Sequence, residues 1–412
     1  DSEEVLRTVS LMLIFLWTCR HRYRDDLLRR FVRIIGVLAC AACIVGIGVY
    51  ILQPVTRFVG TFFDARFHTD YWPNAWTQFV LFAWPVILIA AWQTPSRTLR
   101  VIWMIIVGIT LAALLLSYSR GALIAFGGQS VLLLIMLIAQ RRGHSLRSSL
   151  PVAGSAIAIA LILFVAANAV RGAFHDVQSV GDKITFSADE GTSSVSERRQ
   201  FWEQALILGM GKPLVGWGPY SFRFTQPSLQ QHVLATSDHP HNIFLKLLAE
   251  QGVPAMVLFI TLLVLVIVPH VRTFVDHERD PHTRTRGLLL IAILGVTAHN
   301  LIDYNMQFTG VALPFFLSLG LVCTPRLFQP QRKAAPSRIL EVTVAVCVLV
   351  ISLVEGRYLV LSSLGRHAQA AGEHARALYW YDRAAGEVFS RDMHLSRAEL
   401  YISTDRPDEA RE

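Results

Sequence analysis

Long apolar runs alternate with short polar segments along most of the chain. Ten of these runs come close to the roughly 20 residues that a helix needs to cross a bilayer. They lie at about residues 5–19, 34–53, 74–92, 101–117, 122–139, 150–170, 241–268, 287–304, 309–323 and 339–355. None alternates apolar and polar residues as a half-buried strand would. Because backbone groups inside a bilayer must hydrogen-bond to one another, the pattern predicts an all-α, polytopic membrane bundle of about ten transmembrane helices.

The first of these runs is short, and the chain begins with Asp1 rather than Met. We therefore expect the chain to be truncated at its N-terminus, with one or more helices absent from this count.

Lys and Arg residues are unevenly shared between the loops. The loops that alternation places on one side hold 19 of them, and the short loops on the other side hold 3. The first set comprises 20–33, 93–100, 140–149, 269–286 and 324–338, and the second comprises 54–73, 118–121 and 305–308. Cytoplasmic loops carry an excess of Lys and Arg, so the first set is predicted to be cytoplasmic. The long segments 171–240 and 356–412 then face the outer side.

Composition narrows the class of protein further. Apolar residues make up 53% of the 412 residues and charged residues only 17%, which excludes an intrinsically disordered chain. The net charge of +8 comes from short clusters between apolar runs, so it indicates a membrane protein rather than a nucleic-acid binder. The five cysteines lie in or beside apolar runs, where we expect them to pack as thiols.

The last 57 residues are polar and helical in pattern. Residues 366–385 and 392–404 have the Ala and aromatic spacing of a tetratricopeptide-type helical hairpin, and an amphipathic juxtamembrane helix pair is the alternative. We expect a transmembrane domain over 1–355, with its outer loop at 171–240. An incomplete repeat segment over 356–412 would follow, with a protein as its possible partner.

The segment 237–255 carries the most specific polar cluster on the predicted outer side. Ser237 or Asp238 is expected to cap a helix, so that His241 and Asn242 lie in its first turn at the membrane surface. The positive helix end disfavours an imidazolium there, and a neutral imidazole suits a general base. The alternatives are a surface histidine without function and a zinc site built on His239 and His241.

Arginines on the same side add candidates for anion binding. Arg120 lies in the narrow polar turn SYSRGA, where it could face an anion or extend to phospholipid headgroups. Arg198 and Arg199 open an amphipathic stretch over 199–208, predicted to lie at the membrane interface with Trp202 as its anchor. The glycines at 209, 211, 216 and 218 are interpreted as turns, because Pro213 after Lys212 excludes a Walker phosphate loop.

Two further pairs of polar residues flank predicted spans on the outer side. Arg66 and Asn74 precede or open the third span. His299 and Asp303 lie at the end of the eighth span, with Asn300 between them. Ionisable residues near a membrane indicate function by default, and Asp303 could pair with an arginine or orient a histidine.

Taken in chain order, these residues resemble the O-antigen ligase family, which shares its core with O-antigen polymerases and bacterial protein O-oligosaccharyltransferases. The family pattern His-Asn, nine residues, Gly is met by His241, Asn242 and Gly252, although Ala255 stands where a second glycine is expected. The other matches are Ser119-Arg120-Gly121, Arg198 with Trp202, Gly216 with Gly218, Arg66 with Asn74, and His299 with Asp303. Together they cover about residues 60–310.

The resemblance implies an integral-membrane glycosyltransferase of the C type in the bacterial inner membrane, with its active site facing the periplasm. It would transfer a glycan from undecaprenyl diphosphate to the lipid A–core of lipopolysaccharide, with inversion. His241 would be the general base, and Arg120, Arg198 and Arg199 would bind the diphosphate. Asn242, Asp303, His299, His239, Arg66 and Asn74 would support the site.

Several alternatives remain open at this point. No Asp-x-Asp pair occurs, so we expect a metal-independent reaction without a cofactor, in which arginines stabilise the leaving group. A protein O-oligosaccharyltransferase, which the repeat-like tail favours, or an O-antigen polymerase would use the same donor. A transporter of lipid-linked sugars would instead need polar groups near the bilayer midplane.

Overall fold

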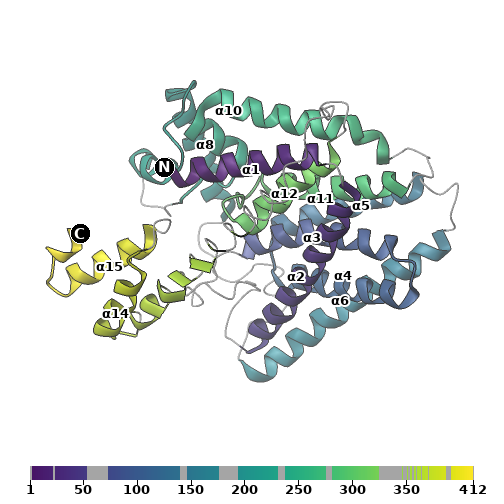
Figure 1. Ribbon diagram of the computed structural model, residues 1–412, viewed down its shortest axis with the longest axis horizontal. Coiled ribbons are helices and arrows are strands. Elements are labelled where there is room, and N and C mark those ends of the chain that lie inside the picture. Colours follow the sequence, from purple (N-terminus) through teal and green to yellow (C-terminus); the bar gives the residue numbers. More distant parts are fainter. Residues whose placement is uncertain are drawn as a thin grey trace. The chain divides into compact units, whose positions relative to one another are not determined.

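The computed structural model describes residues 2–21, 24–52, 73–139, 146–175, 194–230, 237–274, 281–323 and 391–411, together with parts of 346–386. All regular elements in these residues are helices (Figure 1). The long ones in the first part of the chain are α1 (Ser2–Arg20), α2 (Arg24–Leu52), α3 (Pro73–Gln93), α4 (Arg97–Leu116), α5 (Arg120–Ala139) and α6 (Leu146–Phe174). They are followed by α10 (Ile243–Ile267), α11 (Pro281–His299) and α12 (Thr309–Val322).

The polytopic helical architecture is confirmed. Six described helices, α2 to α6 and α10, are long and apolar enough to cross a membrane, and α12 is a shorter apolar helix. The first nine predicted spans coincide with helices, but α1 and α11 carry charged residues in their early turns. The tenth predicted span, 339–355, lies mostly outside the described residues. The number of ten spans therefore stays a prediction.

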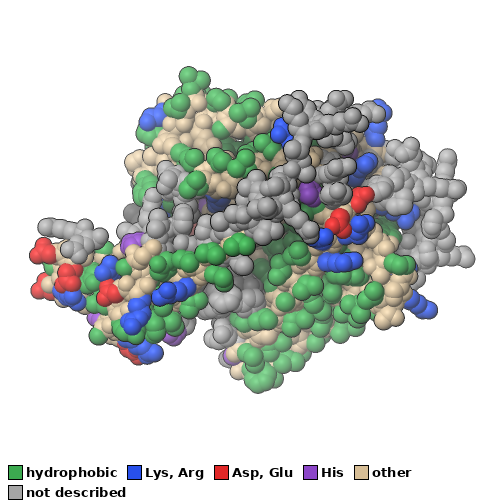
Figure 2. All heavy atoms as spheres, viewed as in Figure 1, with side chains coloured by type: hydrophobic (Ala, Val, Ile, Leu, Met, Phe, Trp, Pro, Cys, Tyr) green, Lys and Arg blue, Asp and Glu red, His purple; other side chains and the backbone are tan. Residues whose placement is uncertain are grey.

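Helix α3 occupies the centre of the bundle. It packs against α4, α11, α2, α5 and α12. Within an 18-residue apolar stretch of each helix, 78% of α3 is buried, compared with 17% of α6 and of α10. Exposed apolar side chains on the outer helices, such as Ile162 of α6 and Leu258 of α10, give the bundle an apolar outer surface, part of which Figure 2 shows. Apolar residues on the outside are expected where the solvent is lipid.

A glutamine joins three helices inside the bundle. Gln129 of α5 accepts a hydrogen bond from Trp84 Nε1 of α3 at 2.8 Å. Its Nε2 donates to the carbonyls of Leu81 in α3 and Ile291 in α11, at 2.8 and 2.9 Å. Because a buried polar group is costly unless it is hydrogen-bonded, these three bonds make Gln129 a structural link rather than a transport site.

The helix ends that alternation assigns to the outer side lie together. Ser119, between α4 and α5, donates to Asn74 at the start of α3 at 2.7 Å. Tyr50 at the end of α2 and Tyr118 both donate to Asn168 near the end of α6, at 2.9 and 3.0 Å. The N–H of Ile243, which opens α10, donates to Asn300 just beyond α11 at 3.0 Å. One end of the bundle thus collects the polar residues that the sequence analysis singled out.

The outer segment before α10 differs from the sequence prediction. Helix α8 (Ser194–Gly211) is longer than the expected 199–208, and Gly209 lies inside it rather than in a turn. Short helices α9 (Phe222–Thr225) and η2 (Gln226–Leu229) follow. Phe201, Ala205 and Leu208 of α8 pack with Phe222 and Ala249 in a small core of their own, which joins α8 to α10.

Chain contacts separate a second compact unit, residues 61–69 with 330–412, from the rest. Its described helices include α14 (His374–Ala384), α15 (Arg391–Ser403) and η4 (Glu409–Arg411). Tyr381 and Ala377 of α14 pack with Met393 and Leu400 of α15. The two helices fall in the stretches predicted to be helical, while the tetratricopeptide-type arrangement and the domain division at residue 355 stay predictions.

Candidate functional site

Two turns at the outer end of the bundle form the candidate site. Helix α11 ends at His299, earlier than the expected residue 304, and the chain turns so that the N–H of Asp303 donates to the His299 carbonyl at 2.9 Å. The second turn precedes α10. Its Asn242 donates from Nδ2 to the Leu301 carbonyl at 2.9 Å, which locks the two turns together. The predicted span 287–304 therefore ends earlier, and Asp303, expected at its outer end, lies in the turn beyond the helix.

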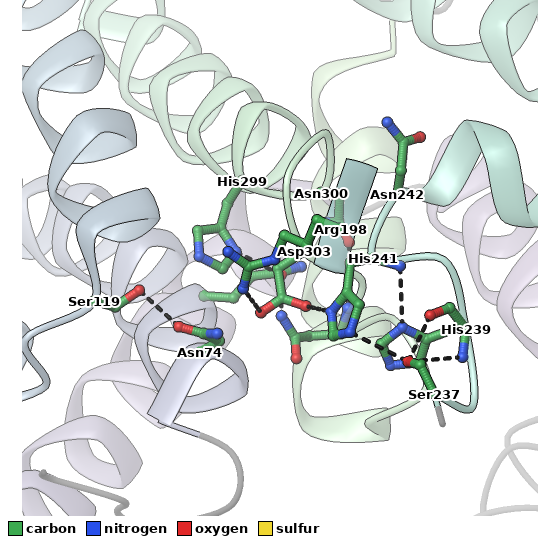
Figure 3. Close-up of polar contacts among 12 residues, drawn as sticks. Asn74, Ser119, Arg198, Ser237, His239, His241, Asn242, His299, Asn300 and Asp303 are labelled. Carbon is green, nitrogen blue, oxygen red and sulfur yellow. Dashed lines mark hydrogen bonds and ion pairs between the residues drawn. The ribbon is translucent and has the colours of Figure 1, made fainter. Parts of the chain in front are cut away.

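The start of α10 also corrects the sequence prediction. The N-cap is Asn242, whose Oδ1 accepts from the N–H groups of Phe244 and Leu245, and not Ser237 or Asp238. His241 consequently precedes the helix instead of lying in its first turn. Asn242 is occupied by capping, and its side chain points away from His241 (Figure 3). Its contribution to the site is to fix the backbone of its neighbour.

His241 is held in an unusual conformation by this arrangement. Its φ of 52° lies in the left-handed region, which residues with a Cβ enter only at an energetic cost. In this pose its Nδ1 lies 2.7 Å from Asp303 Oδ1 (Figure 3). Its Nε2 lies 3.2 Å from Ser237 Oγ. The imidazole is therefore fixed from both sides.

The charge state of Asp303 decides which imidazole nitrogen carries the proton. Burial raises the pKa of Asp303, but the hydrogen bond from His241 and the charges of His241, His299 and Arg198 outweigh it, so the pKa falls below its usual range. An ionised carboxylate only accepts hydrogen bonds, so Nδ1 of His241 must donate. In the neutral imidazole, Nε2 is then left with its lone pair.

Ser237 lies where a proton donor to that lone pair would lie. Its hydroxyl oxygen is 3.2 Å from His241 Nε2 and 2.7 Å from the carbonyl oxygen of His239, and it has one proton for these two acceptors. A hydroxyl group is therefore accommodated directly at Nε2. The sequence pattern marks Ser237 only as a candidate helix cap and not as a partner of His241.

Of the three predicted diphosphate-binding arginines, Arg198 reaches the cluster. Its Nη2 lies 3.8 Å from Asp303 Oδ2, the oxygen that does not face His241 (Figure 3). Arg199, one position on, is exposed and pairs with Glu203 at 3.0 Å. Arg120 is the exposed first residue of α5. A Cβ on the adjacent Gly121 would lie 3.7 Å from His299 Nε2, which places this turn beside the site.

His299 and Asn74 are tied to the helices around the site. His299 Nδ1 lies 3.0 Å from Gln78 Oε1 of α3, which also accepts from Asn305 Nδ2 at 3.0 Å. Asn74 accepts from Ser119 and so fixes the turn that carries Arg120. Arg66 lies outside the described residues.

His239 forms the inner wall of the site. It is 5% exposed, and its Nδ1 accepts the N–H of His241 at 3.3 Å. Burial, followed by the charge of His241, lowers the pKa of His239 to about 3, so this side chain is neutral at ordinary pH. In the described part of the chain, no three His, Cys, Asp or Glu side chains are grouped so that they could hold a metal ion.

A buried ion pair supports this wall, and the sequence analysis missed it. Lys246 Nζ lies 2.5 Å from Glu250 Oε2 inside α10, and 5.2 Å from the ring centre of Tyr304, on which His239 packs. Glu250 also accepts the N–H of Tyr220 at 2.9 Å. Opposite charges four residues apart at the start of an apolar helix were the available signal.

The comparisons with known proteins agree with the sequence resemblance. A family model described as O-antigen ligase matches residues 105–260, from α4 into α10. The match includes Arg120, Arg198, His239 and His241, whereas His299 and Asp303 lie beyond it. No curated protein matches the chain.

Proposed function

We propose a function from the premise that this chain belongs to the O-antigen ligase family. It is a multi-pass membrane protein that transfers a glycan from undecaprenyl diphosphate to an acceptor hydroxyl on the periplasmic face of the inner membrane. The observation that carries this proposal is His241, held by Asp303 at Nδ1 with a hydroxyl group at Nε2. A nitrogen base in contact with a hydroxyl is what deprotonation of an acceptor requires.

The position of His241 along α10 suits a lipid-linked diphosphate. The apolar stretch of α10 continues to Val268, after which the chain turns polar. A helix rises 1.5 Å per residue, so about 20 residues cover a hydrocarbon core of about 30 Å. Counted back from Val268, the outer edge of the core falls near Leu248. The helix continues outward for about 8 Å to Ile243, and His241 just before it lies at the level of the headgroups, where a lipid's phosphates reside.

The proposed reaction uses this geometry. The acceptor hydroxyl takes the place of the Ser237 hydroxyl at His241 Nε2 and gives its proton to that nitrogen. Its oxygen forms a bond to the anomeric carbon of the donor sugar while the bond from that carbon to the diphosphate oxygen breaks. Attack from the face opposite the leaving group inverts the anomeric centre. Asp303 stabilises the imidazolium that forms.

The leaving diphosphate carries two or three negative charges that need compensation. Arg198 lies beside Asp303 with 26% of its side chain exposed, and guanidinium groups bind phosphate oxygens strongly. Arg120 begins α5 next to His299 and is the second candidate. Arg199, paired with Glu203 on the surface, is the weakest of the three.

Two other acceptors fit the same site, because His241 Nε2 can take a proton from a hydroxyl group of any origin. A protein acceptor would make the chain an O-oligosaccharyltransferase, and a lipid-linked repeat unit would make it a polymerase. Transport is less well supported. Among the described residues the ionisable cluster gathers at the outer end of the bundle, whereas the buried Gln129 is neutral and fully hydrogen-bonded.

The test is a transfer assay with purified protein in nanodiscs. Undecaprenyl-diphosphate-linked glycan would be supplied with EDTA and with one of three acceptors: O-antigen-free lipopolysaccharide, a Ser/Thr-rich protein, or a second lipid-linked unit. We expect the lipopolysaccharide to gain mass. Transfer to one of the other two acceptors alone would reassign the acceptor. No transfer to any of them would contradict the proposed function.

A further inference from the structure

The segment from Leu206 to Trp217 exposes many large apolar side chains. The exposed fraction is 75% for Met210, 75% for Leu214 and 72% for Val215. Leu206, Ile207 and Trp217 add to the same stretch with 46%, 58% and 40%. An exposed apolar cluster of this kind marks contact with a protein, a ligand or a membrane. The sequence places it in the outer segment 171–240, and its first residues belong to the stretch 199–208 that was expected to lie at the membrane interface.

The same segment completes the hydrogen bonding of an interrupted membrane helix. Gly252, with φ 82° and ψ 177°, breaks α10, and Pro254 has no N–H to give to the carbonyl of Glu250. Gly218 N donates to that carbonyl at 2.8 Å, and Trp217 N donates to the carbonyl of Ala249 at 3.0 Å.

Helix α10 also donates a hydrogen bond back to the segment. The N–H of Val253, the residue after the break in α10, donates to the Pro213 carbonyl at 2.7 Å. Unpaired backbone groups are costly in a bilayer, so the segment belongs structurally to α10.

Close backbone approach confirms how tightly the two pieces fit. A Cβ on Gly252 would lie 2.7 Å from the Leu214 carbonyl carbon, and one on Gly216 would lie 2.3 Å from that of Glu250. Both glycines also have positive φ. The glycine after the nine-residue spacer and the first glycine of the Gly-x-Gly pair therefore serve one contact.

Helix α8 and the first half of α10 run in the same direction. Just before α10 begins, the ring of His241 lies 5.8 Å from that of Phe201, which is in the middle of α8. Further along both helices, Gly209 packs against Leu248, where a Cβ would lie 2.5 Å from Cγ. Helix α8 therefore runs beside α10 from the level of His241 to that of Leu248. If α10 crosses the membrane, α8 descends toward the hydrocarbon core instead of lying along the interface as its amphipathic sequence predicts.

We infer that Leu206–Trp217 is a re-entrant hairpin whose exposed face lies in the acyl chains of the outer leaflet. The turn meets α10 at Ala249–Val253, at or just inside the edge of the core. The exposed apolar side chains of the hairpin continue into Val253, Val257 and Leu258 of α10, which also face outward. Lys212 lies over the Trp217 ring at 4.0 Å, a pairing suited to the membrane–water boundary.

The inference rests on α10 crossing the membrane and not on the transfer reaction. It also assigns a role to α8: the helix that carries Arg198 would be anchored in lipid at its C-terminal end. The occupant of the exposed face is lipid hydrocarbon. A protein partner at this face would leave it shielded from lipid.

Site-directed spin labelling in nanodiscs tests this directly. Single cysteines at Leu214 and Val215 would be introduced into a variant whose five native cysteines are replaced and whose thermal unfolding midpoint matches that of wild type. Val257→Cys on α10 is the lipid-facing reference, and Arg199→Cys at the start of α8 is the water-facing reference. The collision rates with oxygen and with nickel ethylenediaminediacetate are then compared. All four side chains are exposed, so the labels do not disturb packing.

We expect the labels at 214 and 215 to behave like the label at 257, with oxygen collisions exceeding those of the nickel complex. Nickel accessibility at 214 and 215 equal to that at 199 would overturn the hairpin. Low accessibility to both reagents would indicate a bound protein and would also overturn it. Because no substrate is involved, failure of the transfer assay leaves this result unaffected.

Discussion

His241 Nδ1 lies 2.7 Å from Asp303 Oδ1, although 62 residues separate the two in sequence. The pair joins the turn before α10 to the turn after α11. It fixes the proton of the neutral imidazole on Nδ1, so that Nε2, which faces the Ser237 hydroxyl, keeps its lone pair. If this hydrogen bond sets the tautomer of His241, the negative charge of the Asp303 carboxylate matters as well as its position.

Replacement of the carboxylate should therefore impair turnover more than binding. We expect Asp303→Asn to lower kcat by about 10²- to 10⁴-fold, the range associated with general acid–base groups, and to change KM little. Asp382→Asn, in an exposed ion pair of the second unit, is the control. An unchanged kcat for Asp303→Asn would show that the carboxylate is only structural. The measurement is initial rate against donor concentration.

Neighbouring arginines on α8 provide a matched pair of variants. Arg198 faces Asp303, whereas Arg199 pairs with Glu203 at the surface. Arg198→Ala should lower the transfer rate by about 10²- to 10³-fold, as loss of one charge-stabilising donor does, while Arg199→Ala should stay within about threefold of wild type. The two variants are compared in one membrane preparation. Equal losses for both would contradict a specific role of Arg198.

Acid sensitivity should reveal His239. Its pKa in the folded protein is lowered to about 3, below the value of about 6.5 expected in the unfolded chain. The unfolded state therefore binds more protons between these two values, and the stability falls as pH decreases through that window. The lowered pKa of Asp303 adds a further loss only below about pH 4.

The test uses the thermal unfolding midpoint in detergent as a function of pH. Between pH 6.5 and 4 the midpoint of wild type should fall, and that of His239→Phe should fall less. His374→Phe, at an exposed position of α14, should follow wild type. Parallel curves for all three proteins would contradict the assignment of a buried, neutral His239.

The link through Gln129 predicts a difference between two glycines. A Cβ on Gly295 of α11 would lie 2.0 Å from Gln129 Nε2, whereas one on Gly128 meets nothing within 4 Å. Gly295→Ala must displace the amide and leave the Trp84 N–H without its acceptor, at a cost of about 1–3 kcal/mol. We expect its Tm to drop by several degrees and that of Gly128→Ala not to fall. Identical Tm values for the two variants would contradict a stabilising role of the Gln129 hydrogen bonds.

Much of the fold could be predicted from hydropathy. Nine apolar runs coincide with described helices, because a helix that crosses a membrane appears in the sequence as an apolar run of matching length. Their alternation also assigned Asn74, Arg120, His241 and His299 to one end of the bundle, where the structure brings their turns together. This worked because ionisable groups are costly inside the hydrocarbon and therefore gather near a membrane surface.

The remaining features depend on contacts that periodicity does not report. The amphipathic pattern of α8 indicates which face is buried but not whether the helix lies along the membrane or descends into it. The positive φ of His241 accompanies the capping of α10 by Asn242 and the hydrogen bond from Asn242 to Leu301, a contact between segments about 60 residues apart. The break at Gly252 requires the Pro213–Gly218 segment, which lies far away in the linear pattern.

The measurement that tests the account most directly is the transfer rate of His241→Ala beside that of His374→Ala. Both proteins would be reconstituted at equal amounts with saturating donor and the acceptor found active. We expect a loss of about 10²- to 10⁴-fold for His241→Ala, the range of a general base, and no loss for His374→Ala. A His241→Ala protein that transfers glycan at the wild-type rate would exclude His241 as the base.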